Sequence, residues 1–186
     1  MRDYIDTEKV TERIHIIQGN ITKLEVDAIV NAANTSLLGG GGVDGAIHRA
    51  AGSHLLEACR KLNGCRQGEA KITPGFLLPA KYVIHTVGPV YNGGDKGEPE
   101  ILYSCYINSL TLAVDKQIKT IAFPCISTGV YGYPFQDACK IALNAIFDFL
   151  LCERNIKVFL VCFNDSDYKE YQRIFDDRIQ LVSSCF

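Results

Sequence analysis

The 186-residue sequence lacks a long apolar run, an excess of basic residues and closely paired cysteines. Because no run is long enough to cross a bilayer, we expect no contact with a membrane. A formal net charge of −2 gives no bulk positive field, which argues against nucleic acid as a partner. The N-terminal stretch "MRDYIDTEKVTERIHII" has no apolar signal core and is too acidic for a typical transit peptide, so we expect a cytoplasmic protein.

The eight cysteines follow neither a disulfide nor a zinc pattern, since no Cys-X-X-Cys pair is present. Cys59 and Cys65 flank a polar turn without the thiolate spacing of a metal site. Four others lie in apolar segments, where a free thiol packs as a small hydrophobe: Cys105, Cys125, Cys139 and Cys162. We therefore expect reduced cysteines, no metal and no redox cofactor.

The pattern of apolar residues predicts alternating strands and helices. The length suits a single domain over residues 1–186, with residues 1–12 as an N-terminal extension that forms a turn or helix. Apolar or β-branched runs predict strands at residues 14–18, 26–34, 81–88, 120–126 and 157–163, and a last one at 178–182. The segment at residues 68–80 is broken by Pro74, Gly75 and Pro79, so it predicts a short strand followed by a turn. Helical spacing predicts helices at residues 43–62, 100–116, 137–152 and 167–175. This alternation is typical of an α/β fold with helices on both faces of a sheet.

Two loops that follow predicted strands are rich in glycine. The first, "GGGGVDG", covers residues 39–45, and the second, "STGVYGYP", covers residues 127–134. Glycine lets backbone amides approach a ligand, and a helix start offers unpaired N–H donors that suit phosphate oxygens. Neither loop fits GxGxxG or GxxxxGK[ST], so the standard nucleotide fingerprints are absent. The two loops together favour ligand binding, and a facing pair would suit a diphosphate.

Each polar residue near these loops allows two interpretations, one structural and one functional. Asp44 can stabilise a helix start by about 0.3–1 kcal/mol, or act on a bound sugar. Asn34 can cap a turn or bind a ribose hydroxyl. Tyr131 can belong to the core or cover a ligand. His48, one turn after Asp44, can act as a base or bond locally, whereas His85 in an apolar strand is typical of a satisfied core histidine.

The segments "QGNITKLEVDAIVNAANTSLLGGGGVDGAIHRAAG", "HTVGP" and "FPCISTGVYGYP" together resemble the macrodomain family, in particular its MacroD-type branch. That branch includes bacterial O-acetyl-ADP-ribose deacetylases and mono-ADP-ribosyl hydrolases. The resemblance covers roughly residues 14–175 and implies a three-layer α/β/α fold around a central mixed sheet. It also implies a hydrolase without cofactors, whose ligands are ADP-ribose, its O-acyl esters and mono-ADP-ribosylated proteins.

The resemblance assigns roles to residues of this chain. Asn20 and Ile21 fall where the family holds the adenine, and Asn34 and Asp44 match the pair that arranges the distal ribose and the attacking water. Asp44 would act as general base on the water or simply orient it, and a ligand phosphate could take or share the role of base. The remaining matches line the diphosphate and distal ribose (Gly41, Gly42, Val43 and Gly45), the opposite wall (Ser127, Thr128, Gly129, Val130 and Tyr131) and the adenine (Phe163).

One departure from the family pattern concerns Asn20. The family usually has an aspartate in "GDIT", and this chain has "GNIT". An asparagine oxygen could still accept a hydrogen bond from the adenine amino group, but a charge-assisted bond is roughly twice as strong. We therefore expect weaker or less adenine-selective binding.

Three rival functions stay open at this point. A reader module would bind ADP-ribose without hydrolysis, although Asn34, Asp44 and Tyr131 together favour an enzyme. A phosphatase acting on ADP-ribose 1''-phosphate could use the same cleft. A binder of RNA or poly(ADP-ribose) is disfavoured, because the sequence lacks a basic patch with interleaved aromatics.

Overall fold

The computed structural model of the chain describes residues 7–153 and 155–183. Six strands are β1 (Ile14–Gln18), β2 (Ala28–Ala32), β3 (Ala70–Pro74), β4 (Tyr82–Thr86), β5 (Thr120–Phe123) and β6 (Lys157–Cys162). The helices are α1 (Thr7–Thr11), α2 (Gly42–Ala51), α3 (Ser53–Lys61), α4 (Glu98–Asp115), α5 (Phe135–Cys152) and α6 (Asp165–Ser183), with a short 3₁₀ turn η1 (Ile21–Lys23).

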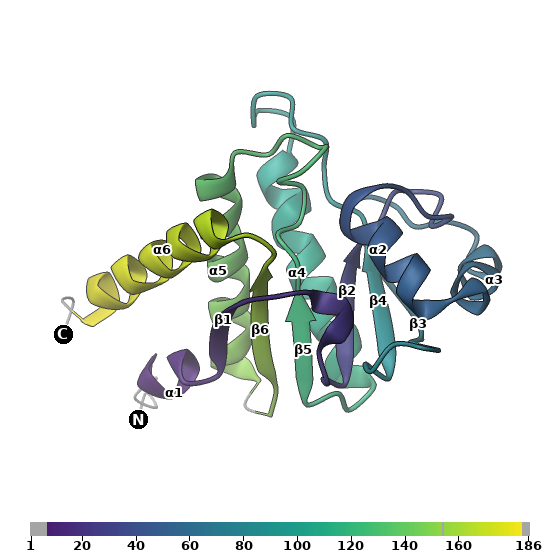
Figure 1. Cartoon of the computed structure of the whole chain (residues 1–186). Coiled ribbons are helices and arrows are strands. Elements are labelled where there is room, and N and C mark those ends of the chain that lie inside the picture. Colours follow the sequence, from purple (N-terminus) through teal and green to yellow (C-terminus); the bar gives the residue numbers. More distant parts are fainter. Residues whose placement is uncertain (1–6, 154, 184–186) are drawn as a thin grey trace.

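The strands form one sheet in the order β1-β6-β5-β2-β4-β3 (Figure 1). All neighbouring pairs are parallel except β3 and β4, which are antiparallel, so the sheet is mixed. Strand β3 lies at one edge, where an antiparallel strand is commonly added to an otherwise parallel sheet.

The sheet separates two apolar cores, one against each face. Along β2, Ala28 and Val30 join the core under α4 and α5, whereas Ile29 joins the core under α2 and α3. This alternation follows from the two-residue period of a strand, and both faces are apolar because helices cover both. The three-layer α/β/α fold with a central mixed sheet is therefore confirmed (Figure 1).

Two sequence predictions are corrected by the structure. Residues 43–62 form two helices, because Gly52 adopts a φ of +82° that ends α2. Both helices pack on the same apolar core, so the helical spacing continues across the break. The strand predicted at residues 178–182 is wrong, since these residues continue α6.

The continuation of α6 has a local cause. No glycine or proline interrupts the helix, and Arg173 pairs with Asp177 one turn later at 3.0 Å. The guanidinium carbon of Arg178 lies 4.4 Å from the ring centroid of Phe147 in α5. These contacts override the strand preference of the β-branched residues that follow.

The predicted N-terminal extension is described in part. Residues Thr7–Thr11 form α1, and residues 1–6 lie outside the described residues. Seven cysteines of the described part are free thiols. Among residues 7–153 and 155–183, no helix has the length and apolar character needed to span a bilayer.

Candidate active site

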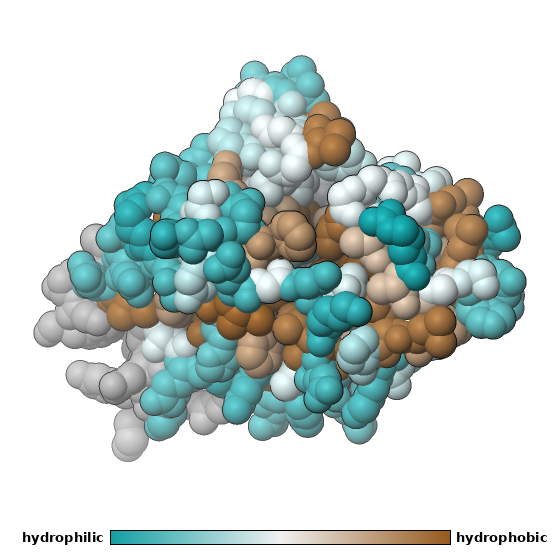
Figure 2. All heavy atoms as spheres, in the orientation of Figure 1, coloured by the Kyte–Doolittle hydropathy of each residue, from teal (hydrophilic) through white to brown (hydrophobic). Residues whose placement is uncertain are grey.

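The two glycine-containing loops line one cleft. Strands β2 and β5 are parallel neighbours, so the loops after them lie at the same edge of the sheet. The cleft has a volume of about 730 Å³, within the range of small-molecule sites. Figure 2 shows apolar surface in the middle of this face, between the positions of α6 and α2 in Figure 1.

The first loop presents free backbone donors to the cleft. Helix α2 begins at Gly42, and its N-cap Gly41 provides no side-chain cap. Within the described residues, no acceptor takes a hydrogen bond from the backbone N–H groups of residues 40–43. Unpaired N–H groups at the start of a helix attract anions, so this wall suits phosphate oxygens.

The second loop offers a similar row of donors from the opposite wall. The N–H groups of residues 128–131 likewise have no acceptor in the described part of the chain. Ser127 has a φ of +65°, which is unusual for a residue with a side chain, and its buried Oγ lacks a hydrogen-bond partner there. A Cβ on Gly88 would lie 2.1 Å from this Oγ, so the backbone two residues after β4 packs closely against the strained turn.

The second loop is also tied to the segment before α4. The backbone N–H of Tyr91 donates to the carbonyl of Tyr131 at 2.9 Å. The Glu98 carboxylate accepts hydrogen bonds from the backbone N–H groups of Asn92, Gly94 and Lys96. The backbone N–H of Glu98 itself, as the largest cause, and these three donors together lower the pKa of the carboxyl group to about 2. The residue 91–97 loop is therefore pinned by an ionised carboxylate and supports the wall of the cleft.

Asp44 is the buried carboxyl group of the cleft, with only 4% of its surface exposed. Its Oδ1 accepts a hydrogen bond from Asn31 Nδ2 at 2.7 Å, and His48 Nε2 lies 3.5 Å from the same oxygen. Its Oδ2 is buried without a hydrogen-bond partner among the described residues. A buried polar atom without a partner is costly, so Oδ2 is suited to receive a hydrogen bond from a ligand or water.

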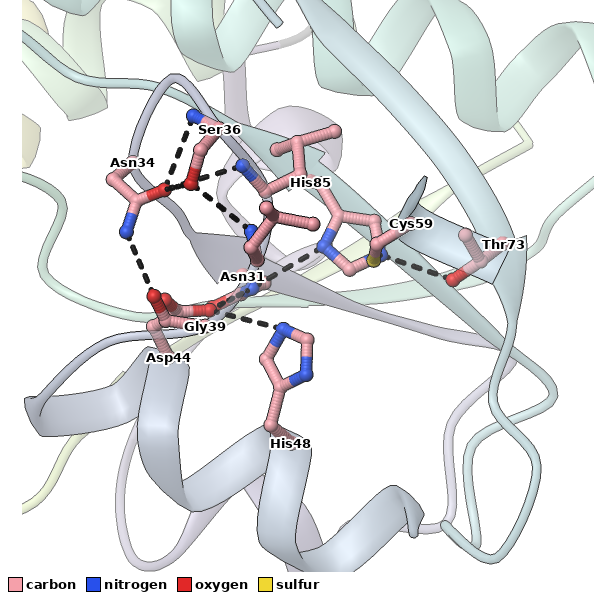
Figure 3. Close-up of polar contacts among 11 residues, drawn as sticks. Asn31, Asn34, Ser36, Gly39, Asp44, His48, Cys59, Thr73 and His85 are labelled. Atoms are coloured by element: carbon pink, nitrogen blue, oxygen red, sulfur yellow. Dashed lines mark hydrogen bonds and ion pairs between the residues drawn. The ribbon is translucent and has the colours of Figure 1, made fainter. Parts of the chain in front are cut away.

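A chain of buried polar side chains lies behind Asp44 (Figure 3). Asn31 Nδ2 lies 3.2 Å from His85 Nδ1, and His85 Nε2 lies 2.9 Å from the hydroxyl of Thr73. Burial, with the nearby His48 as a lesser cause, lowers the pKa of His85 to about 3. His85 is therefore a neutral, satisfied core histidine, as predicted, and it supports the side chain that holds Asp44.

Asn34 lies opposite Asp44 and uses its two ends differently (Figure 3). Its Oδ1 accepts hydrogen bonds from Ser36 and from the backbone N–H of Leu37, so it caps a turn. Its Nδ2 donates to the carbonyl of Gly39 at 2.9 Å. The prediction that Asn34 caps a turn is therefore confirmed. The second N–H of the same amide can still donate a hydrogen bond to a molecule in the cleft.

The side chains of Asn34 and Asp44 converge beside Gly40. A Cβ built on Gly40 would lie 3.1 Å from Asp44 Oδ2 and 3.3 Å from Asn34 Nδ2. A small polar group bound in the cleft beside Gly40, within reach of both atoms, could donate to the carboxyl oxygen and accept from the amide. The absence of a side chain at Gly40 leaves room for such a group.

The structure brings all but one of the candidate site residues to the cleft. These are Asn20, Ile21, Asn34, Gly41, Gly42, Val43, Asp44, Ser127, Thr128, Gly129, Val130, Tyr131 and Phe163. Gly45 does not line the cleft, because it packs beneath the loop, where a Cβ would lie 2.4 Å from the Gly40 carbonyl oxygen. Its role is to let α2 approach the loop.

Comparison with known proteins identifies the family to which the chain belongs. The Macro domain family matches residues 30–142 of the chain. The chain belongs to the macro domain family. The macro domain of Oceanobacillus iheyensis solved with ADP is 47% identical to it, with a TM-score of 0.86 over 89% of this chain and 90% of that one.

Two curated relatives of this macro domain carry the names of enzymes. The O-acetyl-ADP-ribose deacetylase of Citrobacter rodentium is 52% identical over 170 residues, which are 89% of this chain and 96% of that protein. The ADP-ribose glycohydrolase MACROD2 of Xenopus laevis is 56% identical over 165 residues, which are 87% of this chain and 40% of that protein. The expected membership of the macrodomain family, with relatives of the MacroD type, is therefore confirmed.

Sequence reasoning missed several residues of the macro domain cleft. Gly40, Gly88 and Arg49 line it. Arg49 belongs to the last turn of α2, and its guanidinium group reaches back along the helix, so that a Cβ on Gly45 would lie 3.0 Å from its Nη1. Asn31 supports Asp44 and could have been found, because an amide inside an otherwise apolar buried strand must find a hydrogen-bond partner. Gly40 could not be told from its neighbours in the run of four glycines.

Proposed function

We propose that this macro domain binds ADP-ribose and hydrolyses esters formed on its distal ribose. The substrates would be O-acetyl-ADP-ribose and proteins that carry mono-ADP-ribose on acidic side chains. The observation that carries this proposal is that Asp44 Oδ2, which lacks a hydrogen-bond partner in the described part of the chain, and Asn34 Nδ2 both lie close to Gly40 in the donor-rich loop. The names of two relatives and the ADP-bound structure of a third support the choice of ligand.

The two rows of backbone donors would hold the diphosphate. Residues 40–43 and 128–131 supply N–H groups from opposite walls, and Arg49 adds a positive charge at the cleft. With the diphosphate fixed between them, the distal ribose would extend towards Asp44 and Tyr131. Such positioning can supply several kcal/mol of the reaction barrier.

The reaction would be attack of water on the ester carbonyl carbon. The water oxygen bonds to that carbon, the bond from the carbon to the ribose oxygen breaks, and the ribose hydroxyl leaves with a proton. Asp44 would orient the water and accept its proton, alone or together with a ligand phosphate. Asn34 would hold the ribose hydroxyls through its free N–H, and Tyr131 would limit the access of other water.

The test is Asp44→Ala with both substrates, followed by release of ADP-ribose or acetate. We expect loss of at least about 10²-fold in turnover with ADP-ribose binding retained, as for removal of a positioned acid–base group. Thermal unfolding checks that the variant is folded. Turnover near that of the wild type would refute the mechanism, and binding without turnover in the wild type would make the protein a reader.

A further inference from the structure

The cleft has a second end that differs chemically from the end at Asp44. Asn20 follows β1 and Asp44 follows the loop after β2, with β6 and β5 between these strands in the sheet. At about 4.8 Å per strand, the two positions are roughly 14 Å apart. The β1 end is lined by Ile21 and Val161, which are buried, and by Phe163, which is 80% exposed. Apolar and aromatic surface of this kind suits a purine ring.

The amide of Asn20 has a fixed orientation at this end. Its Oδ1 accepts hydrogen bonds from the backbone N–H of Thr22 at 3.0 Å and from the Thr22 hydroxyl at 2.7 Å. A backbone N–H can only donate, so the oxygen and not the nitrogen of the amide must face Thr22. Both lone pairs of the oxygen are then in use, which contradicts the expectation that this oxygen is free for an adenine amino group.

The nitrogen of the same amide is left for a ligand. Within the described residues, no acceptor takes a hydrogen bond from Asn20 Nδ2. Asn20 is exposed and lines the cleft, so this NH₂ group is available to a bound molecule. An aspartate bonded to Thr22 in the same way would instead offer the free lone pairs of a second carboxylate oxygen.

We propose that Asn20 presents a hydrogen-bond donor to the base, so that the cleft accepts a 6-oxopurine, such as hypoxanthine, alongside adenine. Adenine carries an amino donor at C6, and two facing donors form no hydrogen bond. Hypoxanthine carries a carbonyl acceptor at C6, which matches the NH₂ group. The inference rests on the proposed function, because it requires a purine nucleoside diphosphate unit in the cleft with its base at the β1 end.

The experiment compares ADP with inosine 5'-diphosphate (IDP) by calorimetry, on the wild type and on Asn20→Asp. The measured quantity is the ratio of the Kd for IDP to the Kd for ADP. We expect this ratio to rise about tenfold or more in Asn20→Asp. The carboxylate would accept a hydrogen bond from the adenine amino group and would offer no donor to the hypoxanthine carbonyl, and a hydrogen bond to a charged group is worth at least about a factor of ten in Kd. The ratio cancels any effect on folding or on diphosphate binding that both nucleotides share.

A second variant separates the NH₂ group from the turn that Asn20 caps. Asn20→Ser keeps an oxygen that can accept from the Thr22 backbone N–H, but it has no NH₂. We expect its IDP binding to weaken several-fold and its ADP binding to stay within about twofold of the wild type. Equal weakening of both nucleotides would overturn the inference, because Asn20 would then contact a part that they share.

The outcomes distinguish this inference from the function on which it rests. If both nucleotides bind and the ratio is the same within twofold in wild type and Asn20→Asp, the base preference is refuted and the proposed function stands. If neither nucleotide nor ADP-ribose binds to the wild type, both proposals fail. A rise in the ratio supports the inference even if the protein proves to be a reader without turnover.

Discussion

Gly40 offers the smallest perturbation of the point where Asp44 and Asn34 converge. In Gly40→Ala the added methyl carbon would lie 3.1 Å from Asp44 Oδ2 and 3.3 Å from Asn34 Nδ2. Gly40 does not have left-handed backbone torsions, so alanine fits the conformation without strain of that kind. The methyl group would occupy the space that a water or hydroxyl needs about 2.7–2.8 Å from the carboxyl oxygen.

The size of the effect follows from these distances. Ordinary contacts between non-bonded atoms begin near about 3.5 Å, so Asp44 and Asn34 must each move by a few tenths of an ångström. Displacement of reacting groups together with exclusion of the water would lower turnover by about 10²-fold, or roughly 2.7 kcal/mol of barrier. The crowded methyl group should lower the free energy of unfolding by about 1–3 kcal/mol. The lower conformational entropy of the unfolded chain with alanine offsets about 0.4–1 kcal/mol of this loss.

Three measurements on Gly40→Ala distinguish a local effect from misfolding. Release of ADP-ribose from a glutamate-linked mono-ADP-ribosylated protein gives the turnover, calorimetry gives ADP affinity, and urea denaturation gives the free energy of unfolding. We expect the 10²-fold loss of turnover, a smaller change in ADP affinity and a folded protein that is destabilised by about 1 kcal/mol.

The matched control adds the same methyl group near the other end of the cleft. A Cβ on Gly19 meets no atom within 4 Å, and we expect Gly19→Ala to keep turnover within about threefold of the wild type. If Gly40→Ala also stays within threefold of the wild type, the point beside Gly40 is not where the reacting group binds. The mechanism proposed for Asp44 and Asn34 would then be refuted.

Two further predictions concern the buried chain behind Asp44. Asn31→Ala removes the donor to Asp44 Oδ1 and should lower the free energy of unfolding by about 2–3 kcal/mol in urea, whereas a loss under 0.5 kcal/mol would contradict this role. Burial holds the pKa of His85 at about 3, below the 6.5 of an unfolded histidine, so the unfolded state binds the extra proton below pH 6.5. The free energy of unfolding should therefore fall as the pH drops from about 7.5 towards 3, and at pH 5.5 it should be about 1.4 kcal/mol below its value at pH 7.5. His85→Gln should lack this part of the pH dependence in urea titrations at several pH values.

Much of the cleft could be predicted because chain order and strand direction constrain it. In an α/β fold, loops after parallel strands meet at one edge of the sheet, so residues 39–45 and 127–134 could be placed together from the sequence. Asp44 could be placed at the start of a helix for the same reason. The break at Gly52 was not predicted, since the apolar spacing is the same on both sides of it.

Periodicity and glycine placement are local properties of the chain, so the layered fold, the two glycine loops and Asp44 could be found from the amino-acid sequence. Which atoms of these residues are free depends on contacts between elements that are far apart in the chain. The partners of Asp44 come from β2 and from α2 itself, and His85 comes from β4, so their contacts depend on how these elements pack together. The direction of the Asn20 amide likewise depends on the fold of the turn at Thr22, and an amide can present either a donor or an acceptor until such a contact fixes it.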